Sequence, residues 1–216
     1  MSDKTGKTKL ININFVCTGN TCRSYMAEAI ATHLLKTIYF KKKPSLKDKI
    51  SVGSAGTDVM FSEIPLNTYR VLDMVEIPNI KFKPTQLDPS IIKNSNLIIT
   101  MATSHKKNII GSFSSYDEKK IINLIELSNI ILYLQSEKIY SRGAIDNRNI
   151  EKLKTGTMVE KILEKLEAIK NVKFDSIIKT TESDISDPFG KSIDAYLQVA
   201  KLIKENIIIV FDYLFI

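Results

Sequence analysis

The stretch from residue 10 to residue 38 changes its hydrophobic period within a few positions. Residues 10–16, LININFV, form a short apolar run rich in β-branched side chains, which is typical of a buried strand. After a loop that contains glycine, apolar side chains recur every four residues, as on one face of an α-helix, at Met26, Ile30, Leu34 and Ile38. The chain is therefore predicted to start as strand, tight loop and helix.

The same alternation continues along the chain. Three further short apolar runs are ISV from Ile50, NLIITM at 96–101 and KIINLI at 120–125. Helical patterns separate them, most clearly from Leu66 and from Ser104. Strands that alternate with helices predict an α/β fold, with a parallel sheet flanked by helices on both faces.

The alternation stops between about residues 129 and 183. Residues 131–149 show no clean period, whereas residues 151–171 predict an amphipathic helix with an apolar side at Met158, Ile162, Leu166 and Ile169. We interpret residues 10–216 as a single domain that carries this segment as a helical insertion. Residues 1–9 are polar and basic, and we expect a flexible tail there.

The last thirty residues predict a long closing helix, with an apolar face at Ile193, Leu197, Ala200, Ile203, Ile207 and Val210. Its final ten residues are strongly apolar, and we expect them to bury against the sheet. Weak self-association or contact with a membrane surface stays open as an alternative, because exposed apolar patches often mark interaction sites. We otherwise expect a monomer.

Composition and charge favour a folded soluble protein over other classes. Of 216 residues, 44% are apolar and 25% are charged. The chain has no secretory leader pattern and no apolar run long enough to span a membrane, so we expect a cytoplasmic protein with reduced thiols. Much of the net charge of +7 lies in residues 36–49, which are typical of a solvated loop. The sequence shows no pattern of aromatic residues alternating with basic ones that would indicate nucleic-acid binding. The positive charge can instead attract phosphorylated substrates.

The loop between Cys17 and Arg23 is suited to binding a tetrahedral oxyanion. Ligands bind beyond the carboxyl ends of parallel strands, where the next helix directs free N–H groups and the positive end of its dipole. These groups and Arg23 favour the thiolate form of Cys17, and the planar guanidinium can hold two phosphate oxygens. The predicted phosphate-binding residues are Thr18, Gly19, Asn20, Thr21, Cys22, Arg23 and Ser24.

For three residues of this loop, the sequence predicts a backbone conformation or a hydrogen bond. Gly19 permits a positive φ, and Asn20 is among the few other residue types that tolerate one. The Ser24 hydroxyl is expected to hydrogen-bond the Cys17 sulfur, both as thiolate and as leaving group. Together these features predict that Cys17 attacks phosphorus.

A zinc site is a competing interpretation of the two cysteines. It lacks a second ligand pair, because His33 and His105 are isolated in the sequence, so no metal is predicted. His33 is expected to be a packed or solvated helix residue, and His105 a surface residue at a helix start. A purely structural Cys17 would leave the position of Arg23 unexplained.

The string FVCTGNTCRSYMAEAI resembles the catalytic loop of the low-molecular-weight protein tyrosine phosphatase family. Further marks follow in order: GSAGT at 53–57, NLIITM before a helix, and SDPFGKSIDAY at 186–196. The resemblance covers roughly residues 10–128 and 184–205. It implies a four-stranded parallel sheet between helices, and hydrolysis of phosphorylated proteins through a phosphocysteine without a cofactor.

The resemblance also implies roles for individual residues. Asp187, before Pro188, would be general acid and then general base, and proline restricts the backbone of the residue before it. Ser54, Asn20 and Ser24 would support the shape of the loop. Cys22 would form a disulfide with Cys17 under oxidants, with simple packing as the alternative. Asp184 lacks a following proline and is expected to be a loop or capping residue.

Substrate preference is expected to depend on Thr21 and on Phe189, which would flank the stem of the substrate. The strings CTGNTCRS and DPFGKSID are similar to those of the family's arginine-phosphatase branch, whereas tyrosine-directed members carry isoleucine or leucine at the position of Thr21. Hydrolysis of protein phosphoarginine is therefore predicted, with phosphotyrosine as the alternative and a non-catalytic phosphoprotein-binding module as a further one. Arsenate reduction is disfavoured because no cysteine follows Cys22. Tyr25 departs from the family, which usually has proline there.

Overall fold

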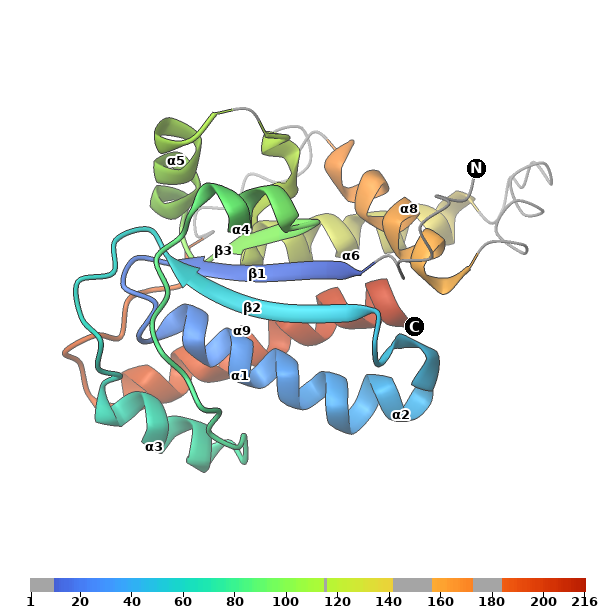
Figure 1. The fold of residues 1–216 in the computed structure, drawn as a ribbon. Coiled ribbons are helices and arrows are strands. Elements are labelled where there is room, and N and C mark those ends of the chain that lie inside the picture. The colour runs from blue at the N-terminus through green and yellow to red at the C-terminus, as the bar shows by residue number, and fades with distance from the viewer. Residues whose placement is uncertain (1–9, 115, 142–156, 173–183) are drawn as a thin grey trace.

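A sheet of four parallel strands lies at the centre of the described part of the computed structural model (Figure 1). The structure describes residues 10–114, 116–141, 157–172 and 184–216. From edge to edge the strands are β2 (Ile50–Gly56), β1 (Ile11–Cys17), β3 (Leu97–Thr100) and β4 (Ile121–Asn123). The chain passes from β1 to one neighbour and then crosses to the other side, so the strand order reverses between β1 and β3. Such a switch point is where ligands bind in open α/β sheets.

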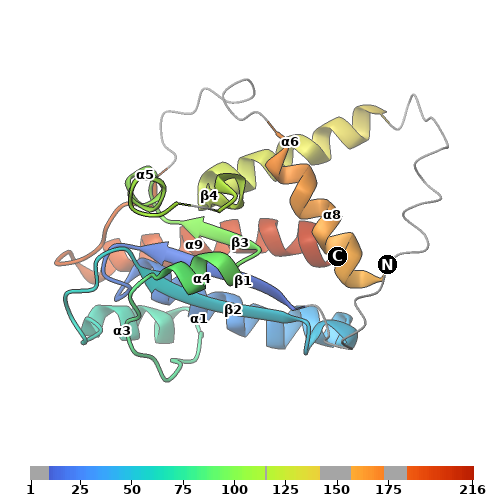
Figure 2. The same cartoon turned by 45° about the horizontal axis from the view of Figure 1, so that its top comes forward.

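Helices cover both faces of the sheet, as the sequence predicted (Figures 1 and 2). On one face, α4 and α5 pack over a small cluster that includes Val16, Ile98 and Ile109. On the other face, a larger core joins β1 residues such as Phe15 to the remaining long helices. The helices are α1 (Arg23–Leu34), α2 (Phe40–Lys42), α3 (Leu66–Met74), α4 (Pro89–Asn94), α5 (Thr103–Ser112), α6 (Leu124–Ser141), α8 (Met158–Lys170) and α9 (Ile193–Phe215).

The apolar end of α9 is buried within the molecule. In its last two turns, the side chains of Val210, Phe211, Leu214 and Phe215 are at most 1% exposed. They lie in the core against α1, α6 and α8, with Tyr39 stacked edge-on against both phenylalanines. Each fully buried side chain of this size contributes about 1.5–3 kcal/mol. The expected burial of this segment is therefore confirmed, and the main contacts of α9 are with the helices α1, α3, α6 and α8.

None of the helices described in the structure combines the length and apolar character needed to cross a membrane.

Two predictions for segments outside the main alternation are wrong. Residues 36–49 were expected to be a solvated loop, but α1 continues through a π-helical turn, Leu35–Tyr39, into α2, and only residues 43–49 form a non-α-helical connection to β2. The lysines of residues 36–49 point outward, whereas Tyr39 and Leu46 are buried. The segment therefore has an apolar side that packs on the core as well as a charged side.

The second correction concerns residues 131–141, for which no helix was predicted. The helix α6 runs continuously through Ser141, because Leu127, Ile130 and Ile131 are buried against α9. Where the amphipathic helix was predicted, the structure has α8, which starts with a capping box between Thr157 and Glu160. That this segment is an insertion stays a prediction. The rest of the predicted insertion, 142–156 and 173–183, lies outside the described residues, as does the predicted tail at 1–9.

Candidate active site

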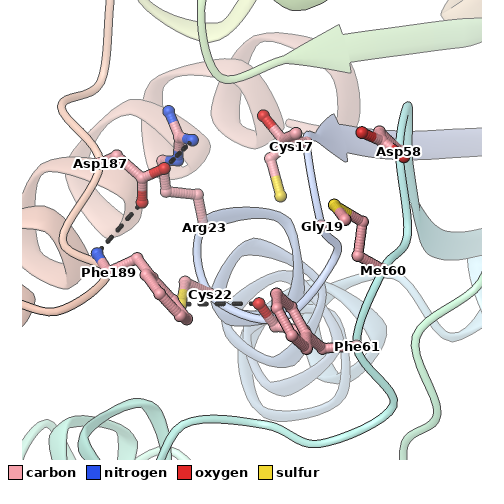
Figure 3. Close-up of a pocket in the computed structure, with 11 residues that line it drawn as sticks. Cys17, Gly19, Cys22, Arg23, Asp58, Met60, Phe61, Asp187 and Phe189 are labelled. Atoms are coloured by element: carbon pink, nitrogen blue, oxygen red, sulfur yellow. Dashed lines mark hydrogen bonds and ion pairs between the residues drawn. The ribbon is translucent and has the colours of Figure 1, made fainter.

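The phosphate loop, residues 17–24, connects β1 to α1 as predicted. Cys17 is the last residue of β1 and Arg23 the first of α1. The N-cap residue Cys22 makes no capping hydrogen bond with its side chain, so the free N–H groups of the first turn remain available to a ligand. The loop lines a cavity of about 170 Å³ (Figure 3) together with more distant segments, and its lining residues are Cys17, Thr18, Gly19, Thr21, Cys22, Arg23, Asp58, Met60, Phe61, Asp187 and Phe189.

Within the described part of the chain, the hydroxyl of Ser24 is hydrogen-bonded to the sulfur of Cys17. Its distance to the Ser24 hydroxyl oxygen is 3.0 Å. The same hydroxyl oxygen accepts a hydrogen bond of 2.8 Å from the Asn20 side-chain amide, which leaves the hydroxyl hydrogen free to point at sulfur. The contact predicted between Ser24 and Cys17 is present.

Asn20 connects the phosphate loop to two other segments. Its amide nitrogen also donates to the Ser54 hydroxyl at 2.8 Å, and its carbonyl oxygen accepts from the Thr85 backbone N–H at 2.8 Å. Ser54 in turn donates to the Glu28 carboxylate at 2.6 Å. Burial raises the pKa of Glu28, and the hydrogen bond from Ser54 opposes that rise. The predicted pair of Asn20 and Ser54 is therefore part of a longer buried chain of hydrogen bonds.

The strained position in the loop is Asn20, with a φ of 55°, and not Gly19, whose φ is not positive. The expectation for Gly19 is therefore wrong, and the asparagine amide compensates for the strain with three hydrogen bonds. A different glycine is sterically required. A Cβ at Gly56, the end of β2, would lie 2.3 Å from the Thr18 carbonyl oxygen, so only glycine lets β2 approach the loop this closely.

Arg23 is buried and holds the acid loop, residues 184–191. One terminal nitrogen donates to the Ile185 carbonyl oxygen at 3.2 Å, and the other lies 2.6 Å from an Asp187 carboxylate oxygen. Its Nε is buried and has no hydrogen-bond partner among the described residues. A buried donor without a partner in this cavity is explained if a ligand oxygen accepts its hydrogen bond.

The two aspartates of the acid loop have different surroundings. The Asp187 side chain is 52% exposed, and besides Arg23 it accepts a hydrogen bond of 3.1 Å from the Phe189 N–H. Asp184 accepts from both the backbone N–H and the hydroxyl of Thr103 at 2.7 Å, and so caps the start of α5. The expectation of a loop or capping role for Asp184 is met, and of these two aspartates it is Asp187 that lines the cavity.

Residues 12–131, more than half of the chain, match the family model described as low molecular weight phosphotyrosine protein phosphatase. The chain belongs to this phosphatase family.

Sequence relatives of this family member carry two different activities in their names. The protein-arginine-phosphatase of Bacillus subtilis (strain 168) is 32% identical over 111 residues, which cover 50% of this chain and 67% of that protein. An arsenate reductase of Bacillus cereus (strain 03BB102) is 32% identical over 46% of this chain, and one of Staphylococcus aureus (strain Newman) is 33% identical over 44%. This chain spans only 64% and 63% of the length of these two reductases.

Solved structures share the fold of this family member. A low molecular weight protein tyrosine phosphatase from T. tengcongensis superposes with a TM-score of 0.60 at 21% identity, covering 94% of this chain and 98% of that one. The YwlE arginine phosphatase from Geobacillus stearothermophilus gives 0.57 at 22% identity, covering 94% and 91%. The family resemblance and the four-stranded fold inferred from sequence are thus confirmed.

His105 is the clearest site-related correction in this phosphatase family member. It is 2% exposed rather than on the surface, and its Nε2 lies 3.1 Å from the Thr18 hydroxyl. Burial, and secondarily the positive charge of Arg23, lowers the pKa of His105 to about 4, so it is neutral at physiological pH. The sequence offered a signal, because α5 follows β3 and starts at the same edge of the sheet as the phosphate loop.

Cys22 and Tyr25 are both packed into the core side of the loop. The Cys22 sulfur lies 3.6 Å from the Tyr196 hydroxyl of α9, and burial raises the pKa of this thiol. Cys17 and Cys22 are both free in this structure, and a redox role for Cys22 stays a prediction. Tyr25, where the family usually has proline, is fully buried with its ring 4.3 Å from that of Phe82, so the substitution fills the core while α1 still starts at Arg23.

Three residues of the cavity rim were not found from the sequence. Met60 and Phe61 are 75% and 61% exposed, and they face the mouth of the cavity beside Asp58 (Figure 3). Phe189, which was predicted to flank the substrate, lies on the acid loop across from them. The signal for the missed residues is that they follow β2, whose carboxyl end opens on the ligand crevice.

Proposed function

We propose that the protein is a protein-arginine phosphatase, which hydrolyses the P–N bond of phosphoarginine in proteins through a phosphocysteine. The observation that carries the proposal is Thr21 in the wall of the cavity. The only partner of its hydroxyl in the described structure is the Cys22 sulfur, at 3.8 Å, so the oxygen can accept a hydrogen bond from a guanidinium N–H. The isoleucine or leucine of tyrosine-directed relatives has no such acceptor. The Bacillus subtilis relative with this activity in its name supports the same choice.

In the first step, the Cys17 thiolate attacks phosphorus and an S–P bond forms. Arg23 and the N–H groups of the phosphate loop hold the phosphoryl oxygens, with Arg23 Nε supplying the donor that is unpaired in the free protein. The P–N bond breaks, and the leaving guanidino nitrogen takes a proton from the Asp187 carboxyl group. Engagement of Arg23 by phosphate releases Asp187 from its ion pair for this transfer.

In the second step, water hydrolyses the phosphocysteine. The Asp187 carboxylate accepts a proton from water as its oxygen bonds to phosphorus, and the S–P bond breaks. Cys17 leaves as a thiolate, stabilised by the Ser24 hydroxyl at 3.0 Å, and inorganic phosphate is released. The chemistry requires reduced Cys17, which agrees with our expectation that the substrates are phosphorylated cytoplasmic proteins.

The decisive experiment compares kcat/KM on matched phosphoarginine and phosphotyrosine peptides for the wild type and for Thr21→Ile. We expect the wild type to prefer phosphoarginine, and the variant to shift the ratio of the two values toward phosphotyrosine by about 10- to 100-fold. That range corresponds to about 1.5–3 kcal/mol for a hydrogen bond to a charged group. A wild type that hydrolyses phosphotyrosine far better, or a variant with an unchanged ratio, would contradict the proposal.

A protein-tyrosine phosphatase of the same mechanism is the second candidate. The observation in its favour is the aromatic rim, where Phe61 and Phe189 can flank a tyrosyl ring. The same peptide comparison decides between the two.

Two further functions are less well supported by the site. A binding module without turnover would not need Cys17, Arg23 and Asp187 around one cavity. Turnover of para-nitrophenyl phosphate by the wild type, abolished in Cys17→Ser, would exclude this function. Arsenate reduction, which the names of several relatives suggest, needs a further thiol downstream, whereas Cys17 and Cys22 are the two cysteines of this sequence.

A further inference from the structure

Asp58 places a second carboxylate in the cavity wall. Asp187 and Arg23 lie on one side of Cys17, and Asp58 lies on the other (Figure 3). The Asp187 carboxylate forms an ion pair with Arg23, whereas the Asp58 carboxylate has no hydrogen bond or ion pair to any described residue. An acidic side chain that lines an anion-binding cavity opposes the binding of phosphate, unless the substrate brings a cation to the same place.

Asp58 is held in register with the nucleophile. The Thr57 N–H donates to the Cys17 carbonyl oxygen at 2.9 Å, and the Asp58 N–H donates to the Thr18 carbonyl oxygen at 3.0 Å. These two hydrogen bonds join the chain after β2 to the phosphate loop, and they depend on the close approach that Gly56 allows. The backbone of Asp58 is therefore positioned by the same contacts that shape the phosphate site.

We propose that Asp58 is a specificity-determining residue, which binds the guanidinium group of phosphoarginine while Arg23 and the phosphate loop bind its phosphoryl group. This inference rests on the proposed protein-arginine phosphatase activity. Phosphoarginine carries a planar cation next to its phosphate, and a carboxylate matches a guanidinium in charge and geometry. Phosphotyrosine carries no cation, so Asp58 disfavours it by repelling the phosphate. One residue thereby attracts the right substrate and repels the wrong one.

The test replaces Asp58 by asparagine, which keeps the backbone contacts and removes the charge. We expect Asp58→Asn to lower the ratio of kcat/KM on phosphoarginine to kcat/KM on phosphotyrosine by about five- to tenfold, as expected for one partly solvated charge pair. The loss should appear mainly in KM for phosphoarginine, and it should shrink as ionic strength rises, because salt screens exposed charges.

Asp48→Asn is the matched control. Asp48 precedes β2 by two residues and Asp58 follows it by two, so both variants change the net charge equally while only Asp58 lines the cavity. The control should leave the ratio unchanged.

An unchanged ratio in Asp58→Asn, or an equal fall on both substrates, would overturn this inference while leaving the proposed function intact. A wild type that hydrolyses phosphotyrosine but not phosphoarginine would instead overturn the proposed function, and the role of Asp58 with it.

Discussion

The phosphate loop and the acid loop meet in one cavity but are built differently. In the phosphate loop, Asn20 and Ser24 are fully buried and linked by hydrogen bonds to β2 and to the segment at Thr85. In the acid loop, Asp187 is half exposed, and its side-chain contacts in the described structure are the Arg23 ion pair and one backbone N–H.

The difference corresponds to what each loop has to do. Phosphate recognition benefits from donors that are already in place, because no reorganisation is then needed as charge develops. In the proposed mechanism, Asp187 has to exchange Arg23 for a leaving group and later for water, so it benefits from few competing contacts. Arg23 connects the two loops, and the predictions below test how far their tasks are separate.

The largest effect is expected for Arg23→Lys. Lysine cannot hold two phosphate oxygens, and it also loses the contacts to Ile185 and Asp187, so kcat/KM should fall by about 10²- to 10³-fold on every phosphorylated substrate. Steady-state kinetics with para-nitrophenyl phosphate measure this. Arg70→Lys, on the exposed face of α3, is the control and should retain full activity. Retention of a tenth of the activity in Arg23→Lys would show that the two loops do not depend on this side chain.

Asp187→Asn should lower kcat about 10²-fold and leave phosphate affinity unchanged or tighter, because the substitution frees Arg23 while it removes the general acid. The measurements are kcat and competitive inhibition by inorganic phosphate. Asp184→Asn, on the same loop, should instead lower the melting temperature through its contact with Thr103 and keep the pH dependence of kcat. If Asp187→Asn weakened phosphate binding as much as turnover, the proposed division between the loops would be wrong.

Asn20→Ala should destabilise the protein by about 2–4 kcal/mol and lower kcat/KM about tenfold. It removes the hydrogen bonds of Asn20 to Ser24, Ser54 and the Thr85 N–H, and it forces alanine to a positive φ. Asn20→Gly separates the two causes, because glycine accepts the φ and should recover about 1 kcal/mol. Denaturant unfolding measures both variants. Equal stability of the two would show that backbone strain contributes nothing at this position.

The smallest effect concerns His105 beneath the phosphate loop. Its pKa is about 4 in the folded protein and about 6.5 when unfolded, so the unfolded state binds more protons between these values and stability falls as pH decreases through them. The loss attributable to His105 should be about 1.4 kcal/mol at pH 5.5 relative to pH 7.5. Unfolding of the wild type and of His105→Gln at both pH values measures it. A wild type with no greater acid sensitivity than the variant would contradict the buried neutral histidine.

Local patterns were sufficient to predict much of the fold and part of the site. The change from a β-branched apolar run to a four-residue period around Cys17 predicted β1, the loop and α1, and the apolar runs from Ile50, Asn96 and Lys120 mark the other three strands. The prediction was wrong where a charged surface hides an apolar face, as at Tyr39, and where helix α6 is stabilised by packing on α9. The helix propensity of the local sequence does not reflect such tertiary contacts.

The sequence by itself determined which groups are available for the chemistry: a cysteine at a strand end, an arginine six residues later at a helix start, and an aspartate before proline. Only the tertiary structure decided that Asn20 and not Gly19 carries the positive φ, that His105 is buried against Thr18, and that Asp58 lines the cavity on the other side of Cys17 from Asp187. The reason is physical. Identity and spacing along the chain set what a side chain can do, whereas burial, strain and charge pairing depend on partners dozens of residues away, which are brought together only when the sheet forms.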